Sequence, residues 1–189
     1  MKIFLILTLS FSICYPDLIK PQNDSELTYI HVFFEWEQEP NAVAYNLEAS
    51  NQSSPNDILL DIEEPTTVYI DTENFNWDNS YNFRVRAIYD NNSFGEWSEL
   101  SSFSIKEKQF PERVPDIYNE DLIQDGLVAF GGFAPEFASV VIDKYGNEIW
   151  NSGEPGSFDF MINHINKFGN IYGQSFYNYP YNTGTKINY

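Results

Sequence analysis

Basic residues are scarce in this chain of 189 residues, where 10 lysines and arginines stand against 28 aspartates and glutamates, for a net charge of −18. Nucleic-acid binding needs clustered Lys and Arg to neutralise phosphates, and the sequence has no such cluster. The same deficit argues against docking on an anionic membrane surface. We therefore expect neither a nucleic-acid partner nor attachment to anionic lipid.

Cysteine and long apolar runs are also lacking. Residues 1–14 carry one positive charge, Lys2, ahead of a short apolar run that is typical of a secretory signal peptide. Cleavage near residues 12–15 would leave a mature protein without disulfides, because Cys14 is the only cysteine. A lipid anchor on Cys14 is the alternative, although Ile13 fits the preceding position of a lipobox poorly. We expect a secreted, periplasmic or cell-surface protein with no transmembrane segment.

Aromatic residues are abundant, at 17% of the chain within a hydrophobic content of 42%, which is too high for a disordered protein. Apolar and polar residues alternate with a period of two through residues 27–105. This alternation predicts short strands over residues 30–36, 45–49, 58–62, 68–70, 81–87 and 103–105. With turn signals between them, they predict an antiparallel β-sandwich and hence an all-β protein.

Particular residues within this region resemble a fibronectin type III domain. They are a Trp on an early strand (Trp36), the run Tyr81-Asn-Phe-Arg-Val-Arg-Ala87, and Gly95-Glu-Trp-Ser98. The resemblance implies that Trp36 is the core tryptophan and that Tyr81 is the tyrosine-corner residue. It also implies a spacer or binding module without chemistry of its own.

Residues 106–117 read as a semi-stiff linker, because charged residues surround Pro111 and Pro115. Beyond the linker the segment Lys144-Tyr-Gly-Asn147 recurs as Lys167-Phe-Gly-Asn170. Each copy predicts a strand, a tight turn with a glycine at positive φ, and a second strand. Repeated hairpins of this kind indicate either propeller strands or two unrelated hairpins that share a common turn.

The sequence around the first copy resembles the start of the propeller in the arylsulfotransferase family. The matching residues are Asp125-Gly-Leu-Val-Ala-Phe-Gly131 and Ser139-Val-Val-Ile-Asp-Lys-Tyr-Gly-Asn-Glu-Ile-Trp150. The resemblance covers residues 118–189 and implies the first blade or blades of an incomplete β-propeller. That family moves a sulfuryl group from a phenolic sulfate ester to a phenol through a histidine, without a cofactor.

A propeller needs at least four blades of about 40–50 residues, and residues 118–189 supply about one and a half. We therefore expect the chain to be the N-terminal part of a longer protein, with the catalytic histidine outside it. Aryl sulfate and phenol, or a surface glycan, would be partners of the full-length protein. The alternative is a non-catalytic extracellular binding or adhesion protein.

The sequence names no catalytic, cofactor-binding or metal-binding residue. His31 is expected on the solvent face of a sandwich strand. His164 is expected on the second hairpin, either as a structural or surface histidine without a basic partner nearby or facing a propeller channel. Neither histidine has the spacing of a hydrolase triad. The carboxylates Asp57, Asp61, Glu63 and Glu64 lack the glycine-centred loop of a calcium site and indicate a solvated acidic face.

Two further sets of residues are open to a surface role. Glycosylation signals begin at Asn23, Asn51 and Asn91, and they matter only in a eukaryotic secretory route. Four aromatic residues could either form a patch for stacking on sugars or partners or serve ordinary packing and turn roles, namely Phe33, Tyr177, Tyr179 and Tyr181.

Overall fold

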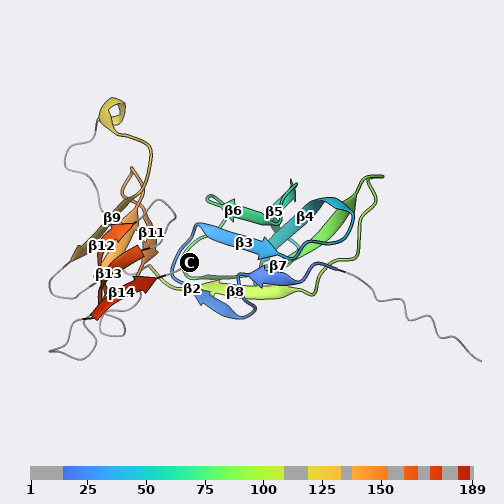
Figure 1. The fold of residues 1–189 in the computed structure, drawn as a ribbon, viewed down its shortest axis with the longest axis horizontal. Helices are drawn as coiled ribbons and strands as arrows, with labels where there is room; N and C mark the ends of the chain where they lie inside the picture. Colours follow the sequence, from blue (N-terminus) through green and yellow to red (C-terminus); the bar gives the residue numbers. More distant parts are fainter. Residues whose placement is uncertain are drawn as a thin grey trace, which may run out of the picture. The chain divides into compact units, whose positions relative to one another are not determined.

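The computed structural model describes residues 15–108, 119–132, 138–152, 160–165, 171–175 and 183–187. The predicted signal peptide and most of the predicted linker lie outside the described residues. The described elements (Figure 1) are β1 (Leu18–Lys20), β2 (Ser25–Leu27), β3 (Val32–Trp36), β4 (Ala42–Asn51), β5 (Ile58–Glu64), β6 (Val68–Asp71), β7 (Asn79–Tyr89), β8 (Ser101–Ile105), the 3₁₀ turn η1 (Glu120–Leu122), β9 (Val128–Gly132), β10 (Ala138–Ile142), β11 (Glu148–Asn151), β12 (Phe160–Ile165), β13 (Ile171–Ser175) and β14 (Thr183–Ile187).

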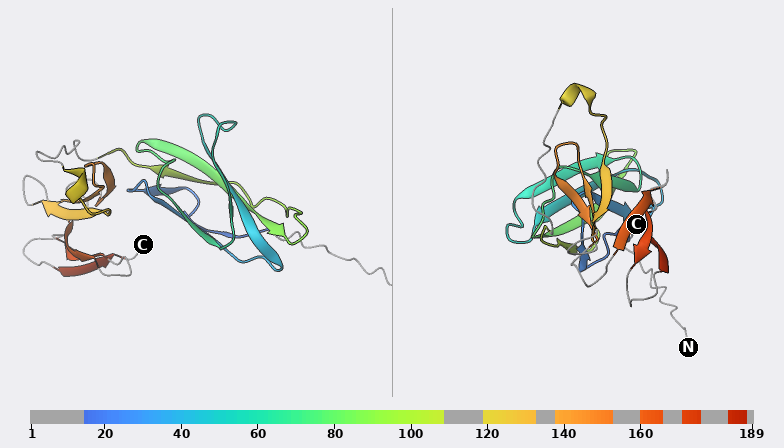
Figure 2. Two further views of the ribbon diagram at one scale, coloured as in Figure 1. Left: turned by 90° about the horizontal axis from the view of Figure 1, so that it is seen from above. Right: turned by 90° about the vertical axis from the view of Figure 1, so that its left-hand side faces the viewer.

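These strands form four sheets, so the all-β prediction is confirmed. The first two sheets have the strand orders β1-β3-β6 and β2-β8-β7-β4-β5, and together they make a β-sandwich. In the second of these sheets β2 runs parallel to β8, and the long strands β4 and β7 lie side by side as a twisted antiparallel pair (Figure 2). The other two sheets have the orders β11-β10-β9 and β12-β13-β14.

The described residues group into two compact units. The first unit comprises residues 15–23, 33–69 and 81–102. The second comprises residues 24–32 and 70–80 together with the described residues after 102. The second unit therefore contains both the ends of several sandwich strands and all of β9–β14.

The core of the first unit follows the alternation in the sequence. Phe34 on β3 lies edge-on to Phe83 on β7 with 5.1 Å between ring centroids, and Trp36 meets Tyr45 on β4 at 5.5 Å. Edge-to-face pairs of this kind stabilise a fold by about 0.5–1.5 kcal/mol beyond their buried area. The buried inward sets on β4 and β7 are those predicted: Tyr45, Leu47 and Ala49, and Tyr81, Phe83, Val85 and Ala87.

The second unit has two apolar clusters. Phe75 lies edge-on to Phe103 on β8 at 5.5 Å, close to the sandwich strand ends of this unit. Val141 on β10 and Trp150 on β11 form another cluster, against which Tyr29 and Ile162 pack. Ile162 belongs to β12, so the β9–β10–β11 sheet packs against the first strand of the next sheet.

Both copies of the repeated segment lie between paired strands, as the sequence predicted. β10 pairs with β11 and β12 pairs with β13, and both pairs are antiparallel. Gly146 in the first turn has a φ of 89°, which is the positive value expected for that glycine. The turn of the second copy lies outside the described residues. The described parts of β9–β14 form two three-stranded sheets and no closed ring of blades.

One strand prediction is wrong at its start. Residues 30–36 were expected to be continuous, but β3 begins at Val32. The backbone at Tyr29 and Ile30 pairs with β11 instead. Period-two alternation cannot reveal this change, because both pairings leave the chain extended and keep the same faces. The short strands β1 and β2 were not predicted either.

The sandwich core yields a direct test. Replacing the fully buried Phe34 with alanine should lower the free energy of unfolding by about 3–5 kcal/mol, because it removes a large apolar side chain and leaves a cavity. Replacing Ile70, which is 57% exposed on β6, with alanine should lower the free energy of unfolding by less than about 1 kcal/mol. Urea denaturation of the two variants compares them directly. Equal losses would contradict the described core.

Candidate functional site

The two histidines lie in different surroundings. His31 lies just before β3 rather than on the strand where it was expected, and it is half-buried like Phe33 and Glu35, which alternate with the buried residues of β3. Burial lowers its pKa below the ordinary histidine value, and the carboxylates of Asp143 and Asp71 partly oppose that effect. His164 lies exposed on β12, with its ring stacked on Tyr172 at a centroid distance of 6.2 Å. The structure does not bring the two histidines together into a described site.

The outward face of β4 and β7 carries a stack of cations and rings. The guanidinium carbons of Arg84 and Arg86 lie 4.3 Å and 4.2 Å from the centroid of the Trp97 ring. Arg86 also lies 3.9 Å from the ring centroid of Phe94. Because Arg84 and Arg86 alternate along β7, they share one face and can reach the same tryptophan.

Polar contacts from β4 hold both guanidinium groups in place. Arg84 forms an ion pair of 2.6 Å with Glu48, and Arg86 donates a hydrogen bond of 3.0 Å to Asn46 Oδ1. Asn46 in turn donates to Asp61 on β5 at 2.7 Å. The stack therefore ties three strands and the segment before β8 together. These arginines are engaged with protein groups, which favours a structural role over the binding of an anionic ligand.

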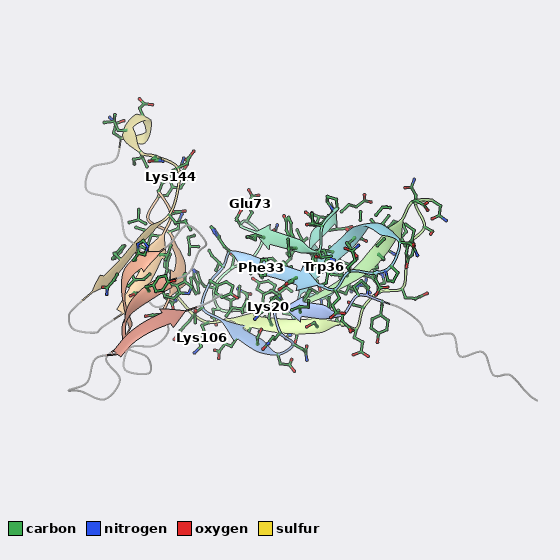
Figure 3. The ribbon with its side chains drawn as sticks, viewed as in Figure 1. Lys20, Phe33, Trp36, Glu73, Lys106 and Lys144 are labelled. Carbon is green, nitrogen blue, oxygen red and sulfur yellow. The ribbon has the colours of Figure 1, made fainter. Side chains whose placement is uncertain are left out.

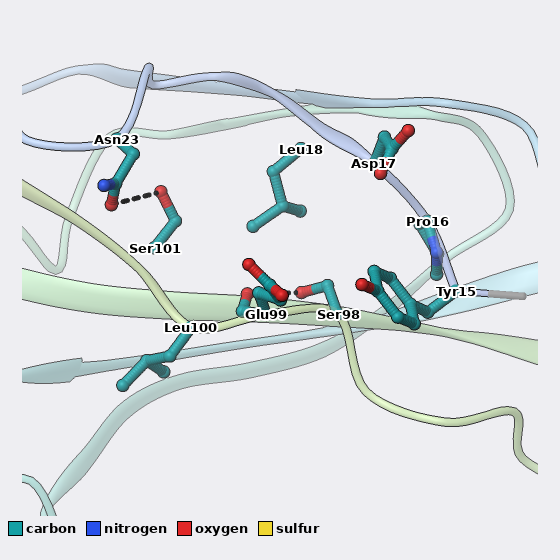
Figure 4. A pocket seen from close by; sticks show the side chains of 9 residues that line it. All are labelled: Tyr15, Pro16, Asp17, Leu18, Asn23, Ser98, Glu99, Leu100 and Ser101. Carbon is teal, nitrogen blue, oxygen red and sulfur yellow. Dashed lines mark hydrogen bonds between the residues drawn. The ribbon is translucent and has the colours of Figure 1, made fainter. Parts of the chain in front are cut away.

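A pocket of about 300 Å³ lies in the first unit between the segment that leads into β1 and the segment that leads into β8. Figure 4 shows its lining, in which Tyr15, Leu18 and Leu100 supply apolar surface and Asp17 and Glu99 supply carboxylates. Some of the polar residues that line it form hydrogen bonds within the lining. Ser101 Oγ donates to Asn23 Oδ1 at 3.3 Å, and Ser98 Oγ donates to the backbone carbonyl of Glu99 at 2.9 Å.

The acidic strand β5 behaves as a hydrogen-bonded surface strand. Glu64 Oε1 accepts from the backbone N–H and the hydroxyl of Thr66, at 3.0 and 2.8 Å. Asp57 and Glu63 are exposed. Within the described part of the chain, no group of three or more His, Cys, Asp or Glu residues is placed to hold a metal ion. No helix in that part is long and apolar enough to cross a membrane.

The three asparagines of the glycosylation signals lie at turns. Asn51 Oδ1 accepts from the backbone N–H of Ser53 at 2.8 Å, and Asn91 Oδ1 accepts from that of Ser93 at 2.9 Å. Asn23 Oδ1 accepts from the backbone N–H of Ser102 at 2.9 Å. The Asn51 and Asn91 side chains therefore shape turns, whereas Asn23 joins the segment before β2 to β8. Of the four aromatic residues predicted to be exposed, Phe33 is half-buried on β3, and Tyr177, Tyr179 and Tyr181 lie outside the described residues. Phe33 is labelled in Figure 3.

The turn between β10 and β11 is organised by one aspartate. Asp143 accepts from the backbone N–H groups of Tyr145 and Asn147, both at 2.8 Å. Lys144, labelled in Figure 3, forms an ion pair of 2.7 Å with Asp125. That hydrogen bond lowers the pKa of Asp125 and raises the pKa of Lys144. Because the pair is largely exposed, it contributes little to stability. The Ile-Asp-x-x-Gly pattern of this turn is thus explained by the hydrogen bonds that Asp143 accepts from backbone N–H groups of the turn.

No protein-family model matches the chain, and no curated protein matches it. Among solved structures, the chain is similar to an Fn3-like protein from Clostridium thermocellum, with 17% identity and a TM-score of 0.39 over 51% of this chain and 97% of that one. It is also similar to a beta-1,2-glucanase from Parabacteroides distasonis, with 13% identity and a TM-score of 0.37 over 52% of this chain and 13% of that one. These matches do not bear on what the chain binds or catalyses.

Sequence reasoning missed the stack around Trp97 and the hydrogen bond that Trp77 Nε1 donates to the backbone carbonyl of Glu148 at 3.1 Å. The alternation of Arg84 and Arg86 predicts that both lie on one face of β7, but it does not reveal which ring they contact. The hydrogen bond of Trp77 had no sequence signal, because Trp77 and Glu148 lie far apart in the sequence.

The arginine stack can be measured by a double-mutant cycle. Combining Trp97→Leu with Arg86→Met should reveal a coupling free energy of about 1 kcal/mol, because each substitution removes the same cation–π contact. Urea unfolding of the wild type, the two single variants and the double variant gives this quantity. A parallel cycle of Trp97→Leu with Lys20→Met serves as the control, since no contact between those residues is described. A coupling near zero in both cycles would contradict the stack.

His31 should make stability depend on pH. Because the pKa of His31 is lowered in the folded protein, the unfolded chain binds its proton more readily, and lowering the pH favours unfolding. The loss of stability should begin near the ordinary histidine pKa of about 6.5 and level off below the folded-state value. Thermal unfolding between pH 5 and pH 7.5 should show a shallower pH dependence for His31→Gln than for the wild type. Identical slopes would refute this assignment.

Proposed function

We propose that this chain is the N-terminal part of a secreted arylsulfotransferase-like protein, in which the sandwich is a non-catalytic positioning module. Sulfuryl transfer from a phenolic sulfate ester to a phenol would use a histidine outside the sequence described here. The observation that carries the proposal is the pair of stacked sheets after residue 119. Each sheet contains one copy of the repeated hairpin, and successive sheets packed in this way are the building principle of a propeller.

Contacts between the two sheets support this proposal. Ile162 at the start of the second copy packs on the Val141 and Trp150 cluster of the first sheet. Its backbone N–H donates a hydrogen bond of 2.8 Å to Ser139 Oγ, and Ser139 is fully buried. A buried serine that accepts from the next sheet fixes the register between the two sheets. Two unrelated hairpins that share only a turn sequence would need no such contact.

A non-catalytic extracellular binding protein is the second candidate, and the pocket in Figure 4 favours it. The side chains of Tyr15, Asp17 and Glu99 at this pocket combine an aromatic ring with carboxylate acceptors, which is the chemistry that recognises sugar hydroxyl groups. In this version the sheets after residue 119 would present or stiffen the binding module.

Sequencing the gene beyond the codon for Tyr189 distinguishes the two candidate functions. If the frame encodes further hairpins of this type, the whole protein should release 4-nitrophenolate from 4-nitrophenyl sulfate only when a phenol acceptor is present. A chain of residues 15–189 serves as the control and should show no such release, because the histidine that would take the sulfuryl group lies outside it in this proposal. A stop codon after Tyr189, or a longer protein without acceptor-dependent release, would reject the sulfuryl-transfer proposal.

A further inference from the structure

Strand β11 has an environment that its place in the β11-β10-β9 sheet does not explain. As the outer strand of a three-stranded sheet it should expose one edge to water. All four of its residues are nevertheless buried, including the polar Glu148 and Asn151, which are 3% and 0% exposed. Buried backbone N–H and C=O groups need partners. Another segment must therefore cover the outer edge of β11.

Residues 28–30 of the same compact unit supply that cover. The backbone N–H of Ile30 donates to the carbonyl of Ile149 at 3.0 Å, and the N–H of Asn151 donates to the carbonyl of Thr28 at 3.0 Å. Tyr29 and Trp150 form the antiparallel bridge between these two hydrogen bonds. Residues 28–30 thus extend the β9–β10–β11 sheet as a short fourth strand.

Side chains reinforce this backbone pairing. Tyr29 packs on the Val141 and Trp150 cluster, and Trp77 Nε1 donates to the backbone carbonyl of Glu148 at 3.1 Å. Trp77 comes from the segment before β7, so two separate stretches of the sandwich region contact the same strand. Burial at this contact also raises the pKa of Tyr29.

Strand β11, which residues 28–30 contact, is stabilised by hydrogen bonds of its own. Asn151 Nδ2 donates to Glu148 Oε1 at 2.8 Å in a buried position. Ser139 and Ser152 exchange two hydrogen bonds of 3.0 Å, one to the Ser152 hydroxyl and one to the Ser139 carbonyl. A polar network that is satisfied internally favours one arrangement of β10 and β11 and presents a fixed edge to a docking strand.

We propose that residues 28–30 are a docking strand whose partner is the outer edge of β11 in the same chain. By strand addition, this pairing holds the sheets after residue 119 onto the sandwich region independently of the covalent link through residues 109–118. Main-chain hydrogen bonds supply the attachment, and Tyr29 with Trp77 supply specificity. This inference does not depend on sulfuryl transfer, because it concerns attachment alone.

Cutting the folded chain tests the proposal. A specific protease site inserted between Glu112 and Arg113 allows the purified, folded protein to be cleaved after folding is complete. The two pieces of the otherwise unaltered chain should co-elute on size exclusion at micromolar concentration. Ile30→Pro, which removes the N–H that donates to Ile149, should raise their dissociation constant about tenfold or more. The matched variant Ile30→Ala keeps that N–H and should dissociate less readily than Ile30→Pro.

Hydrogen exchange on the uncut protein covers the case in which Ile30→Pro fails to fold. Trp77→Phe keeps the aromatic ring but loses the N–H donor to Glu148. It should speed exchange of the Asn151 amide and of β10 amides that do not touch residues 28–30, because docking and the sheet are coupled. Separation of the pieces without any substitution would overturn the proposal. Unchanged exchange in Trp77→Phe would do so as well.

Discussion

The edge of an antiparallel sheet leaves backbone N–H and C=O groups without partners, and this chain is arranged around that constraint. The edge strand β5 stays exposed to water and is protected from pairing with other strands by the charges of Asp61, Glu63 and Glu64. The outer edge of β11 is paired instead, since residues 28–30 add a strand there. One edge is thus kept open to water and the other is buried. The difference explains why β5 is largely exposed while every residue of β11 is buried.

The sandwich strands were predictable from the sequence because one face of each is buried. Phe34, Leu47 and Val85 are all fully buried at positions that the alternation assigned to the core. Alternation depends only on faces, however, and it carries no information about edges. The start of β3, the pairing of residues 28–30 and the short strands β1 and β2 depend on edge partners that are remote in sequence. They could not be predicted from local pattern.

The same distinction applies to the candidate site. Sequence reasoning located Trp36 and Tyr81 in the core, where both are 1% exposed. It could not foresee that Trp97 would receive two arginines, since that contact needs β7 and the segment before β8 to lie together. His31 was misplaced for a related reason. The carboxylates of Asp71 and Asp143, which act on the pKa of His31, belong to distant parts of the sequence that no spacing within residues 30–36 reveals.

The distribution of positive charge bears on where an anionic substrate could react. Arg84 is paired with Glu48 and Lys144 with Asp125, while Lys106 lies 3.7 Å from Glu26. A sulfate ester approaching these groups would have to displace a carboxylate that is already in place, within a protein whose net charge is −18. Stabilising a sulfuryl group in transfer needs preorganised positive charge that faces the substrate. Arg84, Lys106 and Lys144 are therefore suited to holding strands and turns in position.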